Sequence, residues 1–94
     1  MNSNDSVEVL IPEPLREYVG EQESLRADPG TVADIIVQLT EKYPRLGPQL
    51  VTEDAKIAQA TVIAVDGHDI VAMEGLNTAV EGGQSVVIVT SLPV

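Results

Sequence analysis

The residues best suited to binding a metal gather at one place in this 94-residue sequence. His68, the only histidine, lies between the carboxylates of Asp66 and Asp69, and imidazole and carboxylate groups are common metal ligands. Residues so close in sequence do not converge easily on one ion, and no second His or Cys is present to complete a site. Asp-Gly is also a strong hairpin-turn signal, because both residue types tolerate a positive φ. We therefore predict a turn with solvated side chains here, and no metal site.

Two other pairs suggest chemistry on first reading. Gly82-Gly83 is reminiscent of a phosphate-binding loop, but the Lys and Ser/Thr of a P-loop are absent and a strand-like run follows instead of a helix. Glu53-Asp54 offers paired acids, yet neighbours in an exposed turn rarely differ enough in environment to act as separate acid and base. No Ser, His and acid are placed to form a triad. The sequence predicts no catalytic residues and no cofactor site, so we expect a protein that is not itself an enzyme.

The charge balance excludes one large class of partner. Fifteen acidic and five basic residues give a formal net charge of −10, which would repel the phosphate backbone of a nucleic acid. The acids are scattered from Asp5 to Glu81, so they form either a solvated surface or a face for a basic partner. The absence of Cys excludes a disulfide framework, a thiolate zinc site and a cysteine nucleophile.

The start of the chain gives no targeting signal. Met1–Ser6 lacks the basic and apolar regions of a secretory signal peptide, and we expect it to be disordered. No apolar run approaches the roughly 20 residues that a membrane-spanning helix needs. We expect residues 1–94 to form one domain of a soluble, cytoplasmic protein.

One helix, predicted from Thr31 to Tyr43, organises the rest of the fold. Thr31 and Asp34 have the spacing of a capping box, and Pro44 ends the helix. The apolar residues recur with the helical period, on one face: Val32, Ile35, Ile36, Leu39 and Tyr43.

Short runs rich in Val and Ile predict a sheet against this helix. Val7–Ile11 and Glu21–Ala27 are expected to pair as an antiparallel hairpin, with the more polar second strand at an edge. Thr61–Val65 should pair with His68–Val71 across the Asp-Gly turn. Val86–Val89 does not alternate, which predicts a central strand covered on both faces. The fold class is α+β, with a mixed sheet of four to five strands on one main helix.

The segments that connect these elements give less specific predictions. Leu15–Val19 has the spacing of one helical turn under the sheet edge. In the long connection from Arg45 to Ala60, we expect a short helix at Thr52–Ile57 and contacts of Leu46, Leu50 and Val51 with the core.

Four segments, in this order, match the pattern of a known family. Val7–Gly20 ends with P-x-P-L-R-x-x-x-G, Thr31–Pro44 matches T-V-x-x-L…L…YP, Val62–Ile70 matches V-x-V-N-G-x-D-I, and Leu76–Val86 matches L-x-T-x-L-x-x-G-D-x-V. In these segments the chain resembles the MoaD/ThiS family, which includes the small subunit of molybdopterin synthase and the thiamine sulfur carrier. The resemblance implies a β-grasp, ubiquitin-like fold.

The chain departs from the polar positions and from the ending of the family pattern. Asp66 replaces the usual Asn, Gln84 replaces the usual Asp, and the sequence ends on Thr90-Ser91-Leu92-Pro93-Val94 instead of Gly-Gly. In the family, the carboxylate of that Gly-Gly is activated as an acyl adenylate by an E1-like enzyme and converted to a thiocarboxylate. Gly82-Gly83 cannot replace it, because cleavage there would remove the central strand.

Two hypotheses follow from the resemblance. The first is a sulfur-carrier-type protein in molybdopterin or thiamine-type sulfur transfer, with an E1-like adenylating enzyme or a large synthase subunit as partner. The second is a β-grasp protein-binding module that has lost thiocarboxylate chemistry. In both, residues 90–94 are expected to form a mobile tail that binds the partner.

Overall fold

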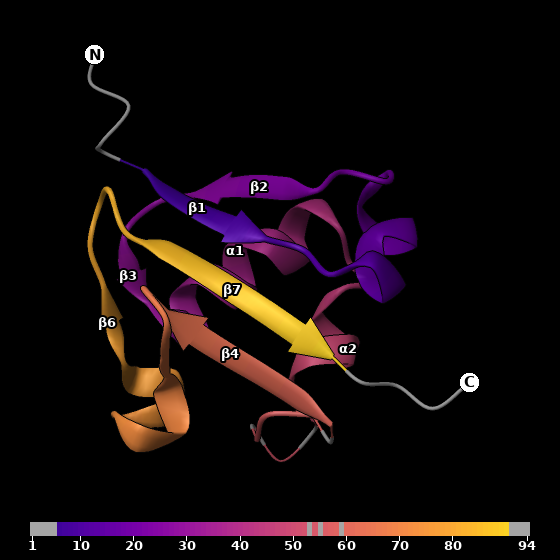
Figure 1. Ribbon diagram of the computed structural model, residues 1–94. Helices are drawn as coiled ribbons and strands as arrows, with labels where there is room; N and C mark the ends of the chain where they lie inside the picture. Colours follow the sequence, from indigo (N-terminus) through magenta and orange to yellow (C-terminus); the bar gives the residue numbers. More distant parts are fainter. Residues whose placement is uncertain (1–5, 53, 55, 59, 91–94) are drawn as a thin grey trace.

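The computed structural model describes residues 6–52, 54, 56–58 and 60–90. A five-stranded sheet, with strands in the order β2-β1-β7-β4-β5, packs on one main helix, α1 (Figure 1). This arrangement confirms the predicted β-grasp fold, with five strands in the main sheet. The bounds are β1 Val7–Leu10, β2 Ser24–Ala27, α1 Val32–Lys42, β4 Thr61–Val65, β5 His68–Asp69 and β7 Ser85–Thr90.

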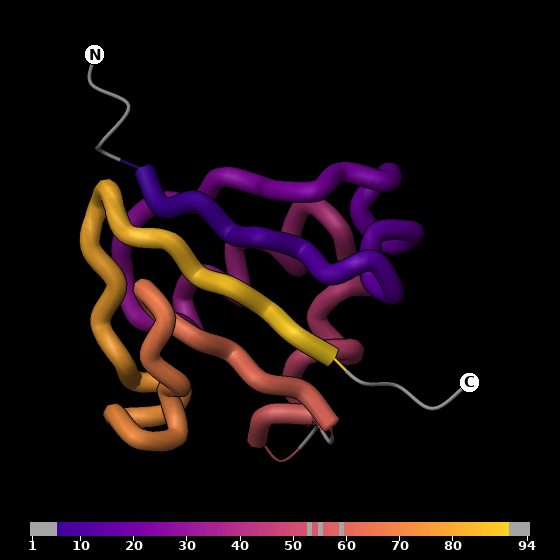
Figure 2. The backbone as a smooth tube through the Cα atoms, viewed as in Figure 1, coloured from indigo at the N-terminus to yellow at the C-terminus, as the bar shows by residue number. Residues whose placement is uncertain are grey.

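The central strand joins the two ends of the chain. β7 pairs with β1 in parallel and with β4 antiparallel, while β2 and β5 pair antiparallel at the two edges. Figure 2 shows this as the N-terminal and C-terminal strands running side by side. A parallel neighbour requires a long crossover connection, and the segment that contains α1 provides it.

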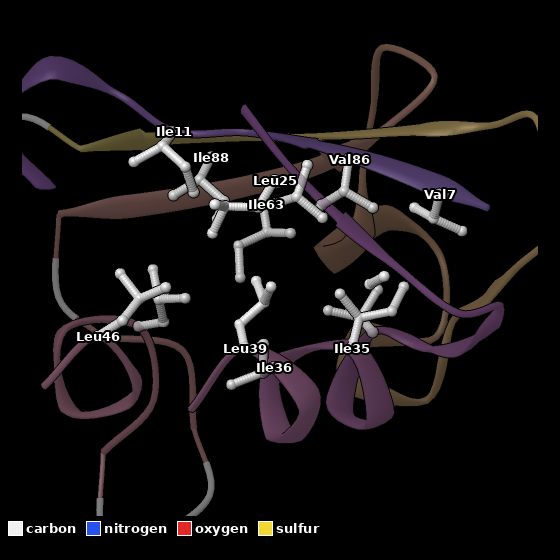
Figure 3. Close-up of a cluster of buried hydrophobic side chains, with 14 of the residues drawn as sticks. Val7, Ile11, Leu25, Ile35, Ile36, Leu39, Leu46, Ile63, Val86 and Ile88 are labelled. Atoms are coloured by element: carbon white, nitrogen blue, oxygen red, sulfur yellow. The ribbon is translucent and has the colours of Figure 1, made fainter. Parts of the chain in front are cut away.

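The helix begins and ends close to the predicted residues. Thr31 is the N-cap, and its hydroxyl accepts a bond from the backbone N–H of Asp34, whose carboxylate accepts one from the N–H of Thr31, each at 3.1 Å. This is the predicted capping box. Tyr43 is the C-cap. The apolar face of α1 points at the sheet (Figure 3), and its buried residues are Val32, Ile35, Ile36 and Leu39.

The connection after α1 differs from the prediction. Its helix, α2, spans Gly47–Leu50, with Leu46 and Leu50 fully buried as expected. The predicted helix at Thr52–Ile57 is wrong, because Val51 and Ile57 pair in an antiparallel bridge. The backbone N–H of Thr52 also donates to the carbonyl of Lys56, which closes this loop without a helix.

Both edge strands are shorter than predicted. Glu21 has a φ of 64° and continues the left-handed turn begun at Gly20, so β2 starts only at Ser24. β5 ends at Asp69, where the chain enters a 3-10 helix. The remaining elements are η2 Glu13–Val19, β3 Gly30–Thr31, η3 Ile70–Ala72, η4 Gly75–Asn77 and β6 Ala79–Val80, with β3 and β6 forming a second, two-stranded sheet.

Two further expectations concern the start of the chain and membranes. Residues 1–5 of the predicted disordered start lie outside the described residues, whereas Ser6 is held by hydrogen bonds from Arg26 and from the backbone of Gly83. Within the part of the chain that the structure describes, no helix has the length and apolar character needed to cross a membrane.

Candidate functional site

The outward side of the central strand is apolar and open. Along β7, Val86 and Ile88 point toward α1 and are buried, whereas Val87 is half-buried and Val89 is 51% exposed on the opposite side. The prediction that this strand is covered on both faces is therefore wrong. A run of four β-branched residues indicates that both sides of the strand are apolar, but the described residues provide only one covering layer, which includes α1.

The neighbouring strands extend this apolar surface. Leu10 of β1 and Ala64 of β4 are the register partners of Val87, and Val62 of β4 is the partner of Val89. Leu10 is 37% and Val62 43% exposed. We call these five residues the open face: Leu10, Val62, Ala64, Val87 and Val89.

Polar residues border the open face. Arg26 pairs in register with Glu8, and Ser24 pairs with Leu10, on the β2 side. Asp69 pairs with Ala64 on the other side. An exposed apolar patch with a polar rim is typical of a surface that binds another protein.

The predicted partner-binding tail begins inside the sheet. Thr90 is the last residue of β7 and the register partner of Thr61, so it belongs to the strand. Its hydroxyl is buried and has no hydrogen-bond partner among the described residues. The rest of the predicted tail, Ser91-Leu92-Pro93-Val94, lies outside the described residues. The strand that carries the outward Val87 and Val89 therefore leads directly into the tail.

A hydrogen-bonded clamp holds the start of β7. The Asp66 carboxylate accepts the backbone N–H of Ser85 at 3.0 Å and the Gln84 amide at 3.1 Å. The side-chain carbonyl of Gln84 in turn accepts the backbone N–H of Glu81 at 2.7 Å. The Ser85 N–H, followed by the Gln84 amide, lowers the pKa of Asp66 below its usual value. This clamp ties the β4–β5 turn to the central strand.

Sequence reasoning found the turn but missed the clamp. Asp66 and Gly67 have φ values of 49° and 86°, as the predicted hairpin turn requires. The signal for the clamp was present, because Asp66 and Gln84 are both departures from the family pattern. The family pattern has Asn and Asp at these two positions and this chain has Asp66 and Gln84, so both pairs combine one carboxylate with one amide.

Two of the candidate metal ligands from the sequence, His68 and Asp69, lie beside this turn. His68 is exposed, and the Asp69 carboxylate accepts the backbone N–H of Val71 at 2.9 Å. Within the described residues, no three His, Cys, Asp or Glu side chains could hold a metal ion together.

The structure describes both residues of the Gly82-Gly83 pair but only one residue of the Glu53-Asp54 pair. Gly82-Gly83 forms a turn as predicted, and the Gly83 N–H donates to the Ser6 carbonyl at 3.0 Å instead of facing a ligand. Glu53 lies outside the described residues, and Asp54 is exposed in a turn.

The sequence matches a family profile over most of its length. The ThiS family profile aligns with residues 9–92. No match was found among curated proteins.

Solved structures share the whole fold. A chain of the Amycolatopsis orientalis BexX/CysO complex is 27% identical, with a TM-score of 0.87, and the alignment covers 94% of this chain and 98% of that one. Mycobacterium tuberculosis CysO, described as an antigen, is 31% identical with a TM-score of 0.85, covering 92% and 99%. The small archaeal modifier protein 1 of Methanosarcina acetivorans is 25% identical with a TM-score of 0.79, covering 95% of each chain.

Proposed function

We propose that this chain, which belongs to the ThiS family, acts as a sulfur-carrier-type protein. Its role is that of a small subunit or protein partner in molybdopterin or thiamine-type sulfur transfer. The match over residues 9–92 and the CysO-like fold support this role. The chain is a carrier or accessory subunit and not a catalyst, and the chemistry takes place in the partner's active site.

The observation that carries the proposal is the continuity of the open face with the end of β7. Val87 and Val89 project from the strand whose last described residue is Thr90. A partner that covers the open face is therefore positioned to receive the residues that follow Thr90. Burial of exposed aliphatic side chains contributes roughly 25 cal/mol per Å² to such docking, and the central strand holds the base of the tail in place.

The proposed partner is an E1-like adenylating enzyme or a large synthase subunit. In the adenylation step, a terminal carboxylate attacks the α-phosphate of ATP and releases pyrophosphate, and hydrosulfide then displaces AMP from the acyl adenylate to give a thiocarboxylate. The A. orientalis relative was crystallised in a complex with BexX, which supports a protein partner here. A step that consumes ATP also supports our proposal of a cytoplasmic location.

ATP–pyrophosphate exchange with the E1-like enzyme of the same organism tests the proposal. We expect more exchange with a variant that has Gly at positions 93 and 94 than with Pro93-Val94, because glycines pass a narrow channel most easily. An intact mass of the native protein identifies its true end and any thiocarboxylate. Absence of exchange with both versions would contradict the carrier role and favour a β-grasp binding module without thiocarboxylate chemistry.

A further inference from the structure

The outer edge of β2 presents backbone groups to solvent. In the antiparallel ladder with β1, the backbone N–H of Ile11 donates to the carbonyl of Glu23, so Glu23, Leu25 and every second residue bond toward β1. The N–H and C=O groups of Ser24 and Arg26 therefore point away from the sheet. β2 pairs only with β1 in the described structure.

One side chain already binds this edge as a strand would. The Gln38 amide of α1 accepts the backbone N–H of Asp28 at 2.7 Å and donates to the Asp28 carbonyl at 3.1 Å. This two-way contact has the pattern of a backbone amide in a β-ladder. Gln38 thus closes the edge at Asp28 and leaves Ser24 and Arg26, the next two outward positions, available.

Two hollows flank this open edge, between β2 and α1. The larger has a volume of about 460 Å³ and the smaller about 260 Å³. Both are lined by Arg26, Leu39 and Lys42, and the larger is also lined by the acidic Asp28 and Glu41, whereas the smaller has no acidic residue in its lining. The Arg26 guanidinium donates a hydrogen bond to the Ser6 hydroxyl at 2.9 Å, and within the described residues no carboxylate forms an ion pair with Arg26 or Lys42. Two of the five cations of a chain with net charge −10 therefore border one groove.

We propose that this groove binds an extended, acidic peptide segment of a partner protein, which adds to the sheet as a strand beside β2. The backbone of Ser24 and Arg26 supplies the ladder bonds. Arg26 and Lys42 bind carboxylates of the peptide. Its aliphatic side chains contact the parts of Leu25 and Leu39 that line the smaller hollow. The smaller hollow, with two basic residues and no acidic residue in its lining, favours an acidic segment, although the rest of the chain repels one.

The groove adjoins the proposed partner surface along one strand, because Ser24 and Arg26 also border the open face. β2 is the outer edge strand, and β1 separates it from β7, which carries the tail (Figure 1). A partner whose contacts stay on β1, β7 and β4 therefore leaves the outer edge of β2 free for a peptide. The groove proposal does not depend on the carrier role, and its test uses no adenylating enzyme.

The test is fluorescence anisotropy with a labelled, amidated pentapeptide, Val-Glu-Val-Glu-Val, at low salt. Its two glutamates supply the negative charge, and the neutral Val-Gln-Val-Gln-Val is the control peptide. We expect at least tenfold weaker binding for the neutral peptide and for the Lys42→Glu variant. Lys56→Glu makes the same charge change in the Thr52–Ile57 loop and should leave the affinity unchanged. Equal binding by all of these would overturn the proposal.

A second measurement tests the backbone pairing. With saturating peptide, the Ser24 and Arg26 amides should exchange with solvent at least tenfold more slowly. Ser24→Pro removes one outward N–H from an edge strand, where proline is tolerated, and should weaken binding at least tenfold. Unchanged amide exchange at both positions in the unmodified chain would overturn the strand-addition mode, whether or not the proline variant folds.

Discussion

The two sides of β7 are built from the same residue types and have opposite environments. Val86 and Ile88 are 2% and 3% exposed against the layer that holds α1, whereas Val89, one residue further, is 51% exposed. The composition of the strand does not decide which side is buried. The element opposite decides it, and α1 covers one side of the sheet (Figure 3).

This difference has a functional meaning. An exposed Val contributes little to the stability of the isolated domain, because its surface stays in contact with water. The same side chain contributes when a second protein covers it. Leu10, Val62 and Val89 lie together on the open side. Burial of these side chains is therefore stabilising only in a complex.

The largest stability effect is expected on the buried side. Leu39→Ala leaves a cavity under the sheet, because Leu39 is 2% exposed, and should lower the free energy of unfolding by about 2–5 kcal/mol. Urea denaturation followed by circular dichroism measures it. A change below about 1 kcal/mol would contradict the packing of α1 on the sheet.

The features that local sequence specifies were predicted well. The capping box of Thr31 and Asp34, the turn at Asp66-Gly67 and the apolar face of α1 all depend on neighbours within four residues. α2 was misplaced because long-range packing fixes it. A Cβ on Gly47 would lie 2.5 Å from Oγ1 of Thr40, so α2 approaches α1 closely, and nothing in the local pattern shows that approach.

The candidate site was predicted only in part for the same reason. Outward exposure of Val89 depends on which face α1 covers, and the Asp66–Gln84 contact joins residues 18 positions apart. The family pattern contains both positions of that contact but does not show that they touch. The role of residues 91–94 stays a prediction.

The second prediction concerns the clamp at the start of β7, which ties that strand to the β4–β5 turn. Asp66→Asn places an amide opposite the Gln84 amide, so two donors face each other, and the melting temperature should fall. The double variant Asp66→Asn, Gln84→Asp restores one donor and one acceptor and should recover most of the loss. A double-mutant cycle with additive effects would contradict the clamp.

The clamp also makes stability depend on pH. Because folding lowers the pKa of Asp66, its contribution is present above the pKa of the unfolded chain, near 4, and is lost as the pH falls through the lowered value. The difference in stability between the unmodified chain and Asp66→Asn should therefore shrink between pH 6 and pH 3. A constant difference, measured by urea denaturation at both pH values, would show that ionisation plays no part.

A smaller effect is expected at the end of the strand. Thr90 follows Val86 and Ile88 on the inward side, and its buried hydroxyl has no partner among the described residues. Thr90→Val keeps the β-branched shape and removes the unpaired group, so it should stabilise the domain by about 1 kcal/mol. Destabilisation in a thermal melt would indicate that the hydroxyl has a partner in solution, such as water.

The smallest stability effect separates folding from binding. Val89→Lys on the open face and Val37→Lys on α1 change the same residue type, at 51% and 57% exposure, by the same charge. Both should alter the free energy of unfolding by less than about 0.5 kcal/mol. Only Val89→Lys should weaken binding to the proposed E1-like partner, by at least tenfold in the Kd from fluorescence titration, because it places a charge in the proposed apolar contact. Equal Kd values for the two variants would show that the partner does not use the open face.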